Sequence, residues 1–117
     1  MIGIDVTVIS RMEKLYGKWG EKGLLKFLSK KEILLVSKPS SYAGFWAAKE
    51  AASKAIGTGI GQDCSFKDIK IYKLPSGQPT IKYKKHIRKQ FGIKSSHLSI
   101  TRDGDLAIAV VVNRLKK

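Results

Sequence analysis

The sequence has 117 residues, of which 43% are hydrophobic and 27% are charged. These values predict one globular domain over residues 1–117 and exclude a disordered chain. A single cysteine and two histidines exclude an intrachain disulfide, a cysteine-based zinc site and a histidine-rich metal centre. The net charge of +14 favours an anionic partner, which nucleic acid, an acidic protein or a phosphate-bearing small molecule would each satisfy. No run resembles a membrane span or a cleavable leader, so we expect a cytoplasmic protein.

Residues 1–9 read MIGIDVTVI and alternate as a β-strand, with Ile2, Ile4 and Val6 on one face. Asp5 falls on the other face and is the anomaly of this segment. An ionised carboxylate in such a run is costly unless it is paired, hydrogen-bonded or bound to a metal. Two interpretations stay open: a strand-end aspartate bonded to backbone amides, or a residue of a functional site.

Short helices are expected next, because a serine followed three residues later by a glutamate is a capping-box pattern. The pattern occurs at Ser10–Glu13, before a helix from Arg11, and at Ser29–Glu32, before a helix over residues 30–36. Pro39 ends that region, and Ser40 or Ser41 is expected to cap the next helix.

Basic residues recur mostly at four-residue steps in this region, so they cluster on one side of each helical piece. A solvated helix face is the ordinary explanation, and a docking surface for an acidic partner helix is the alternative. The residues are Arg11, Lys14, Lys18, Lys22 and Lys26.

Residues 45–61, FWAAKEAASKAIGTGIG, predict a long helix with a glycine-rich exit. At about 100° per residue, one arc collects the polar side chains and the alanines occupy the rest, where their small size allows close packing. The polar arc contains Lys49, Glu50, Ser53 and Lys54, with Trp46 among them. Glu50 and Lys54 also have the spacing of an ordinary helix ion pair, worth about 0.3–0.5 kcal/mol. Gly57, Gly59 and Gly61 allow positive φ and the close approach of a ligand.

The C-terminal half alternates like an antiparallel sheet, with turn residues between its strands. Strands are expected over residues 66–74, 80–83, 98–102 and 106–112, and a basic helix over 84–91. The fold class is therefore α+β, an antiparallel sheet with helices packed on it.

Three segments together resemble the holo-acyl-carrier-protein synthase family, the small phosphopantetheinyl transferases. They are GIDVTVISR at residues 3–11, FWAAKEAASKAIGTGIG at 45–61 and LSITRDGDLAIAVVV at 98–112. The resemblance spans nearly the whole chain and implies the 4′-phosphopantetheinyl transferase fold, typically a homotrimer with active sites between subunits. It also implies the reaction, which serves fatty acid biosynthesis: the 4′-phosphopantetheine arm of coenzyme A moves to a serine of apo acyl carrier protein, releasing 3′,5′-ADP.

The resemblance also implies roles for individual residues. Asp5 and Glu50 match the family's magnesium ligands, and Lys54 matches the lysine near the pyrophosphate, where it would neutralise the leaving group. The serine would lose its proton to Glu50 or to a water molecule on the metal. The residues expected at coenzyme A are Lys49, Ser53, Lys54, Gly57, Gly59, Gly77, Pro79 and Arg102. Those expected to receive the acidic carrier protein are Arg11, Lys14, Lys18 and Lys22.

Two positions depart from the family's pattern. Arg102 stands where the family commonly has histidine, so it can keep a phosphate contact but cannot act as a neutral base. Gln78 stands in a turn that commonly reads N-G-K-P, and it lacks the positive charge of that lysine. Neither departure affects the metal pair.

A basic nucleic-acid-binding module without enzymatic activity is the alternative from another class. Its support is the net charge and a segment in which a tyrosine interleaves with cations: Lys82, Tyr83, Lys84, Lys85, Arg88 and Lys89. The nucleic-acid-binding hypothesis leaves Asp5 and Glu50 unexplained. An inactive relative that only binds coenzyme A is a third possibility, and the intact Asp5, Glu50 and Lys54 count against it.

Overall fold

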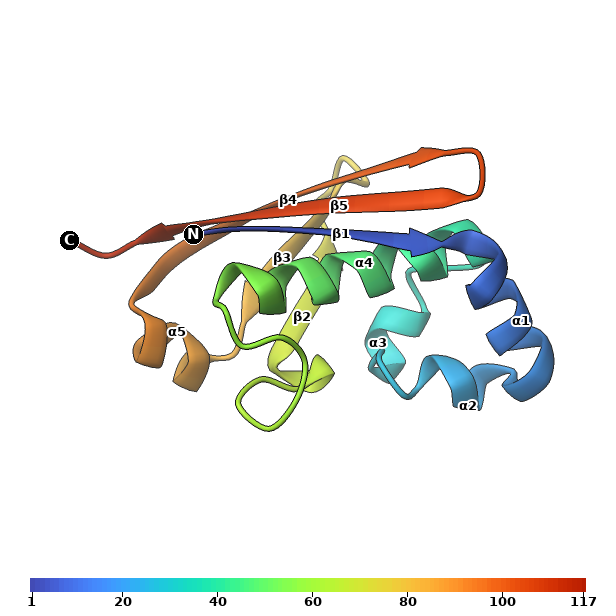
Figure 1. Ribbon diagram of the computed structural model, residues 1–117, viewed down its shortest axis with the longest axis horizontal. Coiled ribbons are helices and arrows are strands. Elements are labelled where there is room, and N and C mark those ends of the chain that lie inside the picture. The colour runs from blue at the N-terminus through green and yellow to red at the C-terminus, as the bar shows by residue number, and fades with distance from the viewer.

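The computed structural model describes residues 1–117. Its elements are β1 (Ile2–Val8), α1 (Ile9–Trp19), α2 (Glu21–Leu24), α3 (Lys30–Ile33), α4 (Pro39–Ala55), η1 (Phe66–Asp68), β2 (Ile69–Lys73), β3 (Pro79–Tyr83), α5 (Lys85–Phe91), β4 (Ile93–Asp103) and β5 (Leu106–Leu115). The strands form an antiparallel sheet in the order β1-β5-β4 and a hairpin of β2 with β3. Figure 1 shows α4 beneath the three-stranded sheet and α1 to α3 gathered at one end. The predicted α+β class is confirmed.

The contact between β1 and α4 is unusually close. A Cβ atom added at Gly3 would lie 2.0 Å from the carbonyl oxygen of Ala51 and 2.6 Å from the amide nitrogen of Ala55. The helix meets the strand at Gly3 with Ala51 and Ala55, which are both buried. Because both surfaces carry so little side chain, the two backbones lie almost against each other, and Asp5 is held directly above α4.

The apolar face of β1 turns away from α4 and is uncovered. Ile2, Ile4 and Val6 expose 70%, 57% and 53% of their surface, whereas Thr7 on the opposite face is buried. The strand buries its small-residue face because only that face allows the close approach at Gly3. The cross-strand partners of the exposed residues on β5 are also apolar: Ile2 pairs with Val112, Ile4 with Val110 and Val6 with Ile108. The β1–β5 ladder therefore presents a continuous apolar surface on the outer side of the sheet.

Local contacts decide where the helices begin. The Ser29–Glu32 capping box is confirmed: Ser29 Oγ accepts from the Glu32 amide at 3.2 Å, and Glu32 Oε1 accepts from the Ser29 amide at 2.8 Å. The expected Ser10–Glu13 box is wrong, because α1 already begins at Ile9 and the hydroxyl of Ser10 donates to Asp105 at 2.6 Å. Asp105, on the β4–β5 turn, takes the role of a cap from across the fold.

Other element bounds differ from the expected ones. Helix α3 ends at Ile33, because the following residues form turns, and α4 begins with Pro39 at its first turn without a serine cap. Strand β2 is shorter than expected because residues 66–68 form a 3₁₀ turn, and β4 begins earlier, at Ile93. No helix combines the length and apolar character that a bilayer crossing requires.

Candidate active site

Helix α4 and strand β1 bring three predicted site residues together. Glu50 and Lys54 lie one turn apart on α4, and Lys54 Nζ is 2.8 Å from Asp5 Oδ1. The other carboxylate oxygen of Asp5 accepts from the Thr7 hydroxyl at 3.0 Å, which fixes its orientation. Asp5 is therefore part of a cluster with side chains from a second element.

The electrostatics of this cluster favour an additional cation. Burial raises the pKa of Glu50, and the negative charge of Asp5 raises that pKa further, while Lys54 opposes the shift. The hydrogen bond to Asp5 raises the pKa of Lys54, which therefore stays charged. Two carboxylates against one ammonium leave an anionic spot in a chain of net charge +14. Because Lys54 is 52% exposed, it can leave Asp5 without a large desolvation change.

Lys49 and Ser53 correct the assignment of the polar arc. Lys49 is 1% exposed, and its Nζ donates to Glu32 Oε1 at 2.8 Å and to the Phe66 carbonyl at 3.0 Å. Ser53 is 0% exposed and donates to the carbonyl of Glu50 at 2.7 Å. Both side chains are buried in this chain, which counts against a side-chain contact with coenzyme A, and that contact stays a prediction. A helical wheel separates polar from apolar side chains, but it does not reveal that Glu32 on α3 is a buried partner of Lys49.

The glycine-rich exit folds back onto the end of α4, near Lys54. Gly57 and Gly59 have φ of 82° and 66°, and the amides of Thr58 and Gly59 both donate to the Ser53 carbonyl at 3.2 Å. This positive φ is the backbone freedom that the sequence predicted. A contact with coenzyme A at these glycines stays a prediction.

Three further predicted ligands of coenzyme A lie on other elements. Gly77 and Pro79 form the β2–β3 turn and the start of β3, with φ of 89° at the glycine. Arg102 on β4 donates to the carbonyl of Ser40 at 3.1 Å, at the opposite end of α4 from Lys54. Ser40 and Glu50 are ten residues apart, about 15 Å along the helix axis. A single chain therefore does not bring Arg102 to the Asp5–Glu50 pair.

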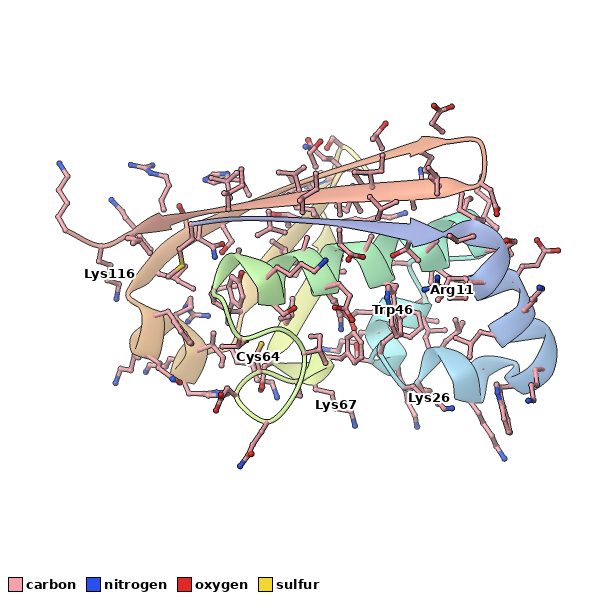
Figure 2. All side chains as sticks on the ribbon, in the orientation of Figure 1. Arg11, Lys26, Trp46, Cys64, Lys67 and Lys116 are labelled. Atoms are coloured by element: carbon pink, nitrogen blue, oxygen red, sulfur yellow. The ribbon has the colours of Figure 1, made fainter.

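A basic groove runs along α1. Arg11, Lys14 and Lys18 line a hollow of about 500 Å³, and Lys22 is not among its lining residues. Its apolar lining consists of Met12, Leu15, Trp19, Trp46 and Phe66. Figure 2 shows Trp46 on α4 on the side nearest Arg11. Sequence reasoning found the basic residues but missed this apolar lining, because α4 and η1 contribute to it from distant parts of the chain.

The aromatic residue that supported the nucleic-acid alternative is not available for stacking. Tyr83 is 1% exposed and its hydroxyl donates to the Ala52 carbonyl at 2.7 Å. Burial raises the pKa of Tyr83 to about 12. The prediction that a tyrosine interleaves with surface cations is therefore wrong for this segment. Only the basic residues of the segment still support the nucleic-acid alternative.

Comparison with known proteins identifies the family. The 4′-phosphopantetheinyl transferase superfamily matches residues 1–111. The chain belongs to this superfamily, among its holo-[acyl-carrier-protein] synthases. The synthase of Aliarcobacter butzleri is 66% identical over 117 residues, which cover 100% of this chain and 99% of the relative. That of Sulfurimonas denitrificans is 54% identical over 95% of this chain and 92% of its own length.

Solved synthase structures share the fold over nearly all of both chains. The crystal structure of the Helicobacter pylori synthase in complex with coenzyme A has a TM-score of 0.93 at 49% identity, covering 97% of this chain and 100% of that one. The Bacillus anthracis synthase in complex with coenzyme A (3′,5′-ADP) has a TM-score of 0.80 at 33% identity, covering 98% and 96%. The family predicted from three sequence motifs is confirmed.

Proposed function

We propose that this enzyme transfers 4′-phosphopantetheine from coenzyme A to a serine of apo acyl carrier protein and releases 3′,5′-ADP. The observation that carries the proposal is the cluster of Asp5, Glu50 and Lys54, formed by two elements of a chain that belongs to the holo-[acyl-carrier-protein] synthases. A complex of the Helicobacter pylori relative with coenzyme A supports coenzyme A as the substrate.

Asp5 and Glu50 fit a magnesium ion. Magnesium prefers oxygen ligands and is commonly held by one or two carboxylates together with substrate phosphates. The raised pKa of Glu50 reflects a partly buried carboxylate beside the charge of Asp5, an arrangement that a divalent cation would relieve. Bound there, magnesium would neutralise the pyrophosphate charge of coenzyme A.

In the proposed reaction, the side chains of the site neutralise the leaving group and remove the proton of the serine. The serine oxygen forms a bond to the phosphorus that carries the pantetheine arm, and the bond from that phosphorus to the bridging oxygen breaks. The leaving 3′,5′-ADP keeps the electron pair, and Lys54 neutralises the charge that develops on it. The serine proton passes to Glu50 directly or through a water molecule that Glu50 orients.

The basic groove on α1 is the proposed docking surface for the acidic carrier protein. Arg11, Lys14 and Lys18 line it and Lys22 follows on α2. The ammonium groups of Lys18 and Lys26 lie 5.2 Å and 5.1 Å from the centre of the Trp19 ring, so cations and an aromatic surface stand together. We expect Arg11→Glu to raise the Michaelis constant for the carrier protein with a smaller effect on that for coenzyme A. An unchanged constant for the carrier protein would count against this surface.

A homotrimer with active sites between subunits is the proposed assembly. Its support is the uncovered apolar ladder of β1 and β5 and the distance between Arg102 and Glu50 within one chain. An exposed apolar surface of this kind marks an interface in many proteins. Sedimentation equilibrium measures the assembly directly, and a monomer at micromolar concentration would contradict it.

The reaction itself is tested by intact-mass spectrometry of apo acyl carrier protein incubated with the enzyme, coenzyme A and magnesium. We expect a mass gain of one phosphopantetheine group, and no gain when a chelator removes the metal. Incubation with Glu50→Ala is the matched protein control. A gain that persists in chelator would overturn the metal requirement, and no gain with several carrier proteins would overturn the transfer.

A further inference from the structure

A second lysine–carboxylate pair lies on a different side of α4 from the candidate active site. Lys49 and Glu32 are 1% and 4% exposed, and their side chains meet at 2.8 Å. The two carboxylate oxygens of Glu32 accept from three donors on three parts of the chain: Lys49 on α4, the Ser29 amide before α3 and the Ile71 amide on β2. Lys49 also donates to the Phe66 carbonyl. This pair therefore joins α4 to α3, η1 and β2 at one point.

The closest contact between α4 and β1 offers little directional resistance. It is made by Ala51 and Ala55 against Gly3, none of which has a long side chain. The Lys54–Asp5 bond also joins the two elements, but its lysine is 52% exposed and solvent screens it. Contacts between such smooth surfaces set how close two elements lie, but they resist rotation of the helix only weakly. Charged hydrogen bonds depend on direction, so the Lys49–Glu32 bond resists that rotation.

Glu50 follows Lys49 directly in the sequence, and any rotation of α4 moves both. A side chain reaches about 5–6 Å from the helix axis, so a rotation of about 15° displaces its end by about 1.5 Å. Displacements of about 1 Å at a reacting group can cost about 100-fold in rate. The position of Glu50 relative to Asp5 on β1 is therefore sensitive to the angle at which α4 is held.

We infer that Lys49 is a positioning residue for Glu50: its buried bond to Glu32 fixes the rotation of α4 and so holds Glu50 beside Asp5. The inference rests on the proposed magnesium site. It assigns Lys49 a function that differs from the coenzyme A contact predicted from the sequence, because the side chain acts from the interior of the fold.

The experiment separates positioning from stability with the double variant Lys49→Met/Glu32→Gln. Either single change leaves one charged or polar partner unpaired in the interior, which strongly destabilises proteins. The double variant leaves no buried charge, and the Glu32→Gln change keeps one oxygen that accepts from either the Ser29 or the Ile71 amide, at the loss of the other bond. Part of the melting temperature lost by Lys49→Met should therefore return. Ile87→Ala on α5, at a fully buried position outside the Lys49–Glu32 contact, is the control that lowers stability alone.

The readout is binding of Mn²⁺, followed by electron paramagnetic resonance in the presence of coenzyme A, together with the magnesium dependence of transfer. We expect the double variant to bind Mn²⁺ about tenfold more weakly than wild type, as for other changes to residues that orient metal ligands. Ile87→Ala should bind as wild type does. Wild-type Mn²⁺ affinity and transfer rate in the double variant would overturn the inference and leave the proposed function intact. A wild type that neither binds Mn²⁺ nor transfers would overturn the metal site and the inference with it.

Discussion

Helix α4 carries two lysine–carboxylate pairs of equal length and different character. Lys54 with Asp5 and Lys49 with Glu32 both meet at 2.8 Å. The lysine of the first pair is 52% exposed and that of the second is 1% exposed. Solvent screens the first pair, so it can open when phosphates and a metal arrive. The second pair is enclosed by backbone donors and holds the helix in place. Burial, more than bond length, separates a chemical role from a structural one.

The largest expected effect is a loss of catalysis, on the side of α4 that carries the Lys54–Asp5 pair. Glu50→Ala should lower kcat by at least about 100- to 1000-fold, because it removes a proposed ligand of the metal that would stabilise charge at the reacting phosphates, and a candidate base for the serine. The free energy of unfolding should change by less than about 1 kcal/mol. Intact-mass spectrometry measures the transfer rate, and urea denaturation measures the free energy of unfolding. Asp5→Ala should show the same two results. Normal activity in either variant would rule out the two-carboxylate site.

The next largest effect sets the two lysines directly against each other. Lys49→Met should lower the free energy of unfolding by about 3–5 kcal/mol, because Glu32 loses its buried counter-charge. Lys54→Met should cost less than about 1 kcal/mol, since half of the Lys54 side chain is exposed and solvent screens the pair. Urea denaturation of both variants measures the two losses of unfolding free energy. Equal losses would contradict the assignment of one pair to the fold and the other to the site.

The sequence singled out the residues of the proposed site, but not the surroundings that hold them in place. Asp5 and Glu50 stood out because a carboxylate in an apolar strand and an acid within a known motif are visible along the chain. The buried contact of Lys49 was not visible, because Glu32 lies 17 positions away and reaches Lys49 only when α3 folds against β2. The same limit applies to β1: alternation identified its two faces, but only the close approach at Gly3 decides which one α4 covers.

A smaller effect tests the close contact that places Asp5 above α4. Gly3→Ala should cost about 1–3 kcal/mol of unfolding free energy, because its Cβ would collide with the Ala51 carbonyl. The same variant should lose activity at temperatures where it remains folded, since β1 carries Asp5. Gly17→Ala is the matched control: nothing lies within 4 Å of its added Cβ. Gly17 lies in the last turn of α1, where alanine should stabilise by up to about 0.5–1 kcal/mol. A stable and fully active Gly3→Ala would contradict the close packing.

The smallest effect is a pH dependence that arises from Glu50, on the candidate-site side of α4. The pKa of Glu50 is raised by burial and by Asp5, so the folded, metal-free protein binds this proton more tightly than the unfolded chain does. Its contribution to stability is present below the ordinary glutamate pKa and is lost as pH rises through the raised value. Relative to Glu50→Gln, the metal-free wild type should therefore become less stable over that interval. Parallel stability curves for the two proteins would show that Glu50 is not perturbed.

In the proposed mechanism, Asp5 and Glu50 hold a divalent cation at the phosphates of coenzyme A. Crystals grown with Mn²⁺ and 3′,5′-ADP would test it through the anomalous signal of manganese. We expect one strong peak within bonding distance of a carboxylate oxygen of both residues and of a phosphate oxygen. A peak at other residues, or none beside well-ordered 3′,5′-ADP, would contradict it.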